Sequence, residues 1–197
     1  GEDAVTSALI GLLETGKKRL YLVVGKGTRS LETLEGAGQK LADLALQQNF
    51  DLQALNLAGV EQVPEDAAAL LLVGLRYDLA ERELAMLRDY WRGERAGLLL
   101  LLDPGSVTPR LHAFLKENGV EPRADRVLVA HSTSAGMRKE FAVEVGFSAV
   151  SPVTRPLAGS LTVLPGQTQS LALADETDER LRDQSVRVTP LMRAADR

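Results

Sequence analysis

Short apolar runs alternate with segments of helical period through the first two-thirds of the chain, and this alternation restricts the possible fold more than any other feature. Each apolar run has the length of a strand, and each intervening segment places its apolar residues on one face of a helix. Strands and helices that alternate in this way predict a parallel sheet covered by helices. The predicted strands are Leu20–Val24, Leu52–Leu57, Leu70–Val73, Leu98–Leu102 and Val127–Val129.

The run Leu98–Leu102 consists of consecutive leucines. A strand that is covered on both faces of a parallel sheet has such a continuous apolar sequence, whereas a strand with one solvated face alternates apolar and polar residues. We therefore expect Leu98–Leu102 to be a central strand.

Helix signals lie between the strands. One helix is expected from about Leu31, and a second follows Asp78, which with Glu81 three residues later gives a start like a capping box. The charged residues of this second helix, Glu83 among them, are expected on its solvated outer face. Thr108 followed by Pro109 predicts the start of a third helix.

The sequence pattern changes after His131. Phe141, Val143, Val145 and Phe147 alternate with polar or small residues, as in a strand with one buried face. We expect residues 1–134 to form a parallel α/β core domain and residues 135–197 to form a β-rich extension packed on it. The extension would add antiparallel strands and end in a flexible tail.

Composition removes several classes of function. The formal net charge is −4 and aromatic residues make up 4% of the chain, so we expect no nucleic-acid partner. There is no cysteine and there are two histidines, which argues against thiolate nucleophiles and against a metal site. No cofactor is expected, and no apolar run is long enough to span a bilayer.

Ligands of open α/β sheets bind outside the carboxyl ends of the strands, so the loops that follow the predicted strands are the candidate sites. No ligand can be named from this position. The candidate ligand-binding residues on these loops are Lys26, Thr28, Arg76, Asp103, Ser106 and His131.

Neither of the chemical motifs suggested by these loops is complete. Gly25–Thr28 lacks the upstream glycine of a phosphate-binding P-loop, and Ser30 stands where a dinucleotide-binding fingerprint has its third glycine. Asp103, Ser106 and His131 suggest a catalytic triad, but the Gly-x-Ser-x-Gly nucleophile elbow is missing. We therefore expect no catalytic residue.

Several segments, taken in order, resemble the gliding-motility-type (GldG-like) auxiliary domain of ABC transport systems. These segments are Val63–Ala67 leading to Gly74, Leu79–Arg92, Leu101–Pro104, Leu111–Val129, Ser151–Leu157, Leu164–Leu171 and Val188–Leu191. The resemblance implies a three-layer core like that of flavodoxins and class I glutamine amidotransferases. It also implies an extracytoplasmic (periplasmic) domain at the bacterial inner membrane, beside an ABC permease and ATPase, with its membrane tether outside the sequence given.

Two departures from the family pattern bear on activity. The family often has a Gly-His-Gly-Glu-like turn where this chain has Gly25–Thr28, and His-Pro where it has Ser151-Pro152. The amidotransferase-like fold normally uses a nucleophilic cysteine, which is absent here. We therefore expect a non-catalytic binding or scaffolding domain. The alternative is an amidotransferase-like or hydrolase-like enzyme that uses Ser, Asp and His at the strand ends.

Overall fold

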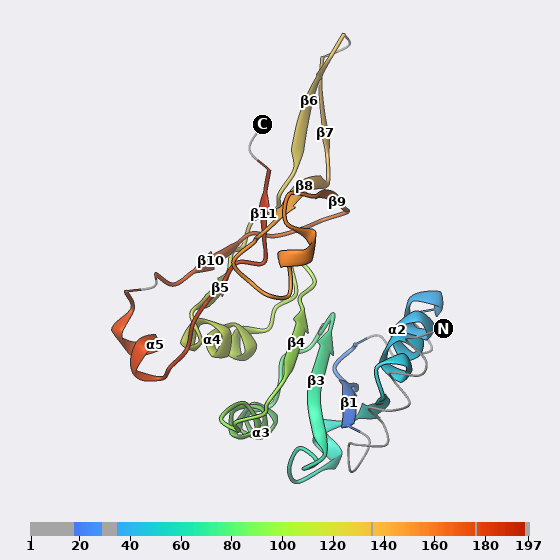
Figure 1. Cartoon of the computed structure of the whole chain (residues 1–197), viewed down its shortest axis with the longest axis vertical. Helices are drawn as coiled ribbons and strands as arrows, with labels where there is room; N and C mark the ends of the chain where they lie inside the picture. Colours follow the sequence, from blue (N-terminus) through green and yellow to red (C-terminus); the bar gives the residue numbers. More distant parts are fainter. Residues whose placement is uncertain (1–17, 29–34, 135, 176, 196–197) are drawn as a thin grey trace. The chain divides into compact units, whose positions relative to one another are not determined.

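The computed structural model describes residues 18–28, 35–134, 136–175 and 177–195. It is a mixed α/β structure in which a parallel sheet is followed by antiparallel strand pairs (Figure 1). The broad α/β class and the antiparallel strands of the C-terminal third are therefore confirmed.

The chain divides into two compact units, Gly1–Leu111 and His112–Arg197. This division lies earlier than the boundary expected after residue 134. Among the described residues, the strands that follow residue 112 pair only with one another. This pairing explains why the division comes before residue 134. The two units are described separately below.

A four-stranded parallel sheet forms the first unit, with the order β2-β1-β3-β4. Its strands are β1 (Lys18–Val23), β2 (Phe50–Leu55), β3 (Ala67–Val73) and β4 (Leu98–Leu101). Four of the predicted strands and their parallel arrangement are thereby confirmed.

The described helices of the first unit are α2 (Glu35–Gln47), the 3₁₀ turn η1 (Leu57–Gly59) and α3 (Glu81–Trp91), and α4 (Pro109–Glu117) follows them. Leu31, where the first helix was expected to begin, lies outside the described residues. The start of α4 at Pro109 agrees with the predicted Thr108-Pro109 signal. In the first unit, η1 and not an α-helix connects β2 to β3.

The predicted capping role of Asp78 is wrong. Its carboxylate accepts hydrogen bonds from the backbone N–H groups of Arg110 (2.9 Å) and Leu111 (3.3 Å), and it therefore caps α4. The first turn of α3 instead uses Glu83, whose carboxylate accepts the Ala80 N–H at 2.6 Å. Asp78 thus links the loop after β3 to a helix that begins some 30 residues later, a contact that local spacing does not reveal.

Leucine side chains from strands, helices and loops form the core of the first unit. Burial of each contributes roughly 1.5–3 kcal/mol to stability through removal of apolar surface from water. The fully buried residues of this core are Leu22, Val23, Leu57, Leu70, Leu72, Leu75, Leu79, Leu87 and Leu111.

β4 is an edge strand, and the prediction that Leu98–Leu102 is central is wrong. Leu99 and Leu101 are 48% and 52% exposed. The fifth predicted strand, Val127–Val129, does not join the sheet: Val127 forms an antiparallel bridge with Thr168, and Val129 begins an antiparallel hairpin. Without that neighbour, β4 has a free edge among the described residues. A continuous apolar run therefore did not indicate burial on both faces.

Antiparallel pairs make up the second unit (Figure 1). β8 (Ala142–Phe147) lies between β9 (Leu161–Pro165) and β11 (Met192–Ala194), and its Val143 and Val145 are buried as their alternation predicts. The remaining elements are β5 (Val120–Pro122) paired with β10 (Leu171–Leu173), β6 (Val129–Thr133) paired with β7 (Gly136–Glu140), the 3₁₀ turn η2 (Arg155–Leu157) and α5 (Glu179–Asp183).

Candidate functional site

The candidate site lies at the carboxyl ends of β1 and β3, which are neighbours in the sheet. The chain passes from β1 to β2 on one side of β1 and then returns to β3 on the other side, so the strand order reverses between β1 and β3. In open α/β sheets this reversal is the position where ligands bind. The loops that meet there are Gly25–Thr28 and Gly74–Asp78.

Backbone hydrogen bonds join these two loops directly. The Lys26 carbonyl accepts the N–H groups of Arg76 at 3.0 Å and of Tyr77 at 3.1 Å. Gly27 has φ +65°, and a Cβ at this position would lie 2.9 Å from the Cβ of Arg76. Glycine is therefore needed here both for its backbone conformation and for the close approach of the second loop.

The side chain of Lys26 is also engaged. Its Nζ lies 2.6 Å from Oε2 of Glu83 on α3, and the two side chains are 18% and 3% exposed. An ammonium that neutralises a buried carboxylate is held by that carboxylate, since separating the two would leave a buried charge without a partner. Lys26 thus attaches the β1 loop to α3 and is not a free cation for a ligand.

Thr28 and Arg76 leave polar groups unused at the same edge. The Thr28 hydroxyl oxygen is buried and has no hydrogen-bond partner among the described residues. Arg76 is exposed, and within the described part of the chain it forms no ion pair. These two side chains could contact a ligand.

The loop after β4 brings Asp103 to the same edge. A Cβ on Gly74, whose φ is +59°, would lie 3.0 Å from Oδ2 of Asp103. Ser106 belongs to the same turn, because its N–H donates to the Asp103 carbonyl at 3.1 Å. Five of the predicted site residues therefore follow parallel strands of one sheet, as expected from the sequence. They are Lys26, Thr28, Arg76, Asp103 and Ser106.

His131 does not share this position. It lies within β6, opposite Arg138 in the antiparallel hairpin. The prediction that it follows a parallel strand is wrong, because Val127–Val129 does not enter the parallel sheet. The suggested trio of Asp103, Ser106 and His131 consequently has no strand edge in common.

Glu83 is the residue of this site that the sequence interpretation assigned wrongly. It was expected on the solvated face of α3, yet its side chain is 3% exposed. The signal that could have identified it is its position four residues before Leu87, which places both side chains on the same face of the helix.

The described residues include neither a candidate metal site nor a helix that could span a membrane. Among them, no group of three or more His, Cys, Asp or Glu side chains could hold a metal ion. The helices within the described ranges are also too short or too polar to cross a membrane.

Comparisons with known proteins give a likeness of fold. Neither the protein-family models nor the curated proteins contain a match to this sequence. Among solved structures, the chain is similar to one titled "mmIFT52 N-terminal domain", with a TM-score of 0.57 and 18% identity. The likeness covers 80% of this chain and 69% of the other. At this identity the two chains share a fold, and no activity is carried from one to the other.

Proposed function

We propose that this chain is a non-catalytic binding or scaffolding domain of a membrane-anchored auxiliary protein in an ABC-type export or gliding-motility system. The domain would lie on the extracytoplasmic (periplasmic) face of the bacterial inner membrane. Its partners would be the ABC permease and ATPase subunits or other proteins of the membrane complex. This assignment is supported by the segments that resemble the GldG-like family and that follow one another in the family's order, from Val63–Ala67 to Val188–Leu191.

The proposed core is flavodoxin-like or class I glutamine amidotransferase-like. The strand order β2-β1-β3-β4 supports it, because the flavodoxin-like order begins with the same four strands. The first unit differs from a complete doubly wound sheet in the short connection through η1 and in β4, which has no further strand beside it among the described residues.

The contacts of Lys26 within the protein are the main observation in support of a non-catalytic function. At the edge where an α/β sheet binds its ligand, the Lys26 ammonium pairs with buried Glu83 and the Lys26 carbonyl accepts two N–H groups. A phosphate site needs a cation that is free to meet the phosphate, and a nucleophile needs a base within hydrogen-bond reach. The groups around Lys26 instead hold the loops of the protein together.

The alternative function is an amidotransferase-like or hydrolase-like enzyme. It is favoured by the hydroxyl of Thr28, which has no hydrogen-bond partner among the described residues, and by the shared turn of Asp103 and Ser106. These groups leave oxygen atoms near a ligand position. Under this alternative, Ser106 would act as the nucleophile.

Affinity isolation of the tagged full-length protein from native membranes tests the proposal. We expect the permease and ATPase to be enriched over a tagged, unrelated membrane protein. In parallel, the purified chain should show no amidase, esterase or ATPase turnover above background, and Ser106→Ala should leave that background unchanged. Turnover that Ser106→Ala abolishes, with an unchanged circular dichroism spectrum, would establish the enzyme in place of the scaffold.

A further inference from the structure

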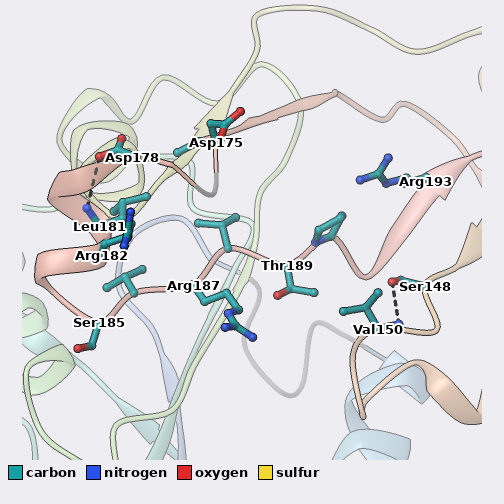
Figure 2. Close-up of a pocket in the computed structure, with 14 residues that line it drawn as sticks. Ser148, Val150, Asp175, Asp178, Leu181, Arg182, Ser185, Arg187, Thr189 and Arg193 are labelled. Atoms are coloured by element: carbon teal, nitrogen blue, oxygen red, sulfur yellow. Dashed lines mark hydrogen bonds between the residues drawn. The ribbon is translucent and has the colours of Figure 1, made fainter.

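The second unit contains a pocket of about 750 Å³ that lies between two stretches of chain (Figure 2). Asp175 and Asp178 lie on one side of it, and Ser185, Arg187 and Thr189 lie on the other (Figure 2). A volume of this size accommodates a ligand much larger than a single phosphate or carboxylate.

Arginine side chains give this pocket a positive charge. Arg182, Arg187 and Arg193 line it, and none of the three forms an ion pair with another described residue. Three arginines and two aspartates in the lining give it a formal charge of +1, whereas the chain as a whole carries −4. Arginine forms paired hydrogen bonds with carboxylates and phosphates, and an anionic ligand would satisfy these side chains.

The carboxylates in the lining already have partners of their own. Asp178 accepts the N–H groups of Arg180 at 3.0 Å and Leu181 at 3.3 Å. Asp175 accepts the N–H of Thr177 at 2.9 Å and its hydroxyl at 2.8 Å, and these bonds lower the pKa of Asp175. Both carboxylates thus accept hydrogen bonds within their own turns, and no described carboxylate forms an ion pair with the three arginines.

The segment that carries Arg187 and Thr189 across the middle of Figure 2 also has backbone groups without a hydrogen-bond partner in the described structure. Hydrogen bonds hold this segment at its two ends, from Val186 N–H to the Leu181 carbonyl (2.8 Å) and from Ser148 N–H to the Leu191 carbonyl (2.9 Å). Between them, the N–H and C=O groups of residues 187–189 have no hydrogen-bond partner in the described part of the structure. Val188 fixes the segment by packing against Gly119, where an added Cβ would lie 2.7 Å from its Cγ2.

We propose that this pocket is a docking groove for an extended acidic peptide of a partner protein. The peptide backbone would pair with residues 187–189 as an added strand, and its carboxylates would contact Arg182, Arg187 and Arg193. The inference rests on the proposed binding function and names the chemistry of the partner segment. A small anion would fill little of the pocket and leave the backbone groups unpaired, whereas an extended peptide satisfies the charge and the backbone together.

Fluorescence anisotropy with the full chain tests the groove. The probe is a labelled peptide of alternating Glu and Val, and the matched control peptide has Gln in place of each Glu. We expect the acidic peptide to bind about tenfold or more tightly than the control peptide. Methylation of the backbone nitrogens of the acidic peptide should weaken its binding by a similar factor, since an added strand needs its N–H groups. The double variant Arg187→Gln/Arg193→Gln should also lose about tenfold or more, whereas Arg95→Gln, at an exposed arginine of the first unit, should bind like the wild type.

Four results would overturn the groove. They are no binding of the acidic peptide, equal binding of its methylated form, an equal loss in Arg95→Gln, and displacement of the peptide by an equal concentration of inorganic phosphate. Membrane isolation of the double variant separates this inference from the proposed function. If the variant loses peptide binding but still retains the permease, the scaffold stands and the groove is not its docking site. Loss of the permease together with the peptide supports both.

Discussion

The Nζ of Lys26 lies 2.6 Å from Oε2 of Glu83, whose side chain is 3% exposed. This ion pair joins the loop after β1 to helix α3 at the edge of the sheet where a ligand would bind. A glycine-lysine-glycine turn can therefore serve the packing of the protein.

Lys26→Met should destabilise the fold by about 3–5 kcal/mol, because it leaves the Glu83 carboxylate buried without its ammonium. Equilibrium denaturation measures the change. The double variant Lys26→Met/Glu83→Gln should recover much of the loss, since the buried charge is then removed while Gln can still accept the Ala80 N–H. An unchanged free energy of unfolding in the single variant would show that the pair contributes nothing.

Gly97→Ala should cost about 1–3 kcal/mol by overpacking, because its Cβ would lie 2.8 Å from the Ala68 carbonyl oxygen and 2.9 Å from the Ala69 Cβ. Gly59→Ala is the matched control, since a Cβ at that position would have no atom of a more distant residue within 4 Å among the described residues. Thermal melts of the two variants compare the effects. Equal melting temperatures would show that β3 and β4 are not packed as closely as the structure has them.

Leu72→Ala should cost about 2–5 kcal/mol, since this side chain is 0% exposed and its loss creates a cavity. Leu101→Ala should stay within about 0.5 kcal/mol of the wild type, because Leu101 is 52% exposed at the sheet edge. Leu100, the partner of Leu72 in the register and only half-buried, should fall between them. Urea denaturation gives the order, and a larger loss at Leu101 than at Leu72 would place β4 inside the sheet.

Asp125 should titrate below its ordinary pKa in the folded protein. Its carboxylate accepts the Ser170 hydroxyl at 2.5 Å and the Ser170 N–H at 2.8 Å, which favours the charged form. Because the folded pKa is lowered, this contribution to stability is present above the unfolded pKa and is lost as the pH falls through the folded value. NMR titration of the Asp125 carboxyl should show a higher pKa in Ser170→Ala, and an identical value would exclude the hydrogen bond from the Ser170 hydroxyl.

The sequence predicted the elements whose signals are local. β1, β2 and β3 end near glycines or turn residues, and Pro109 begins α4, so their positions were readable from the chain. The position of β4 at the edge of the sheet could not be predicted from the sequence. A run of leucines has the same pattern in a central strand and in an edge strand, and the position of β4 depends on where the distant segment Val127–Val129 pairs.

The candidate site was predictable to the same degree. Loops after parallel strands share one edge of a sheet, which correctly grouped Lys26, Arg76 and Asp103. The partner of Lys26 was missed because a glutamate on a charged helix is normally solvated, and tertiary packing buries Glu83. His131 was misplaced because its strand was assigned to the wrong sheet.

The central claim is that this chain binds a membrane transport complex. Photo-crosslinking in the native membrane is the most direct test of this claim. A photoreactive residue would replace exposed apolar side chains in turn, with Tyr77 in the first unit and Val150 in the second as the first positions because they are 68% and 74% exposed. The binding account predicts covalent adducts with an ABC permease subunit from at least one of these positions, identified by mass spectrometry. Adducts with no ABC subunit from any exposed position would contradict it.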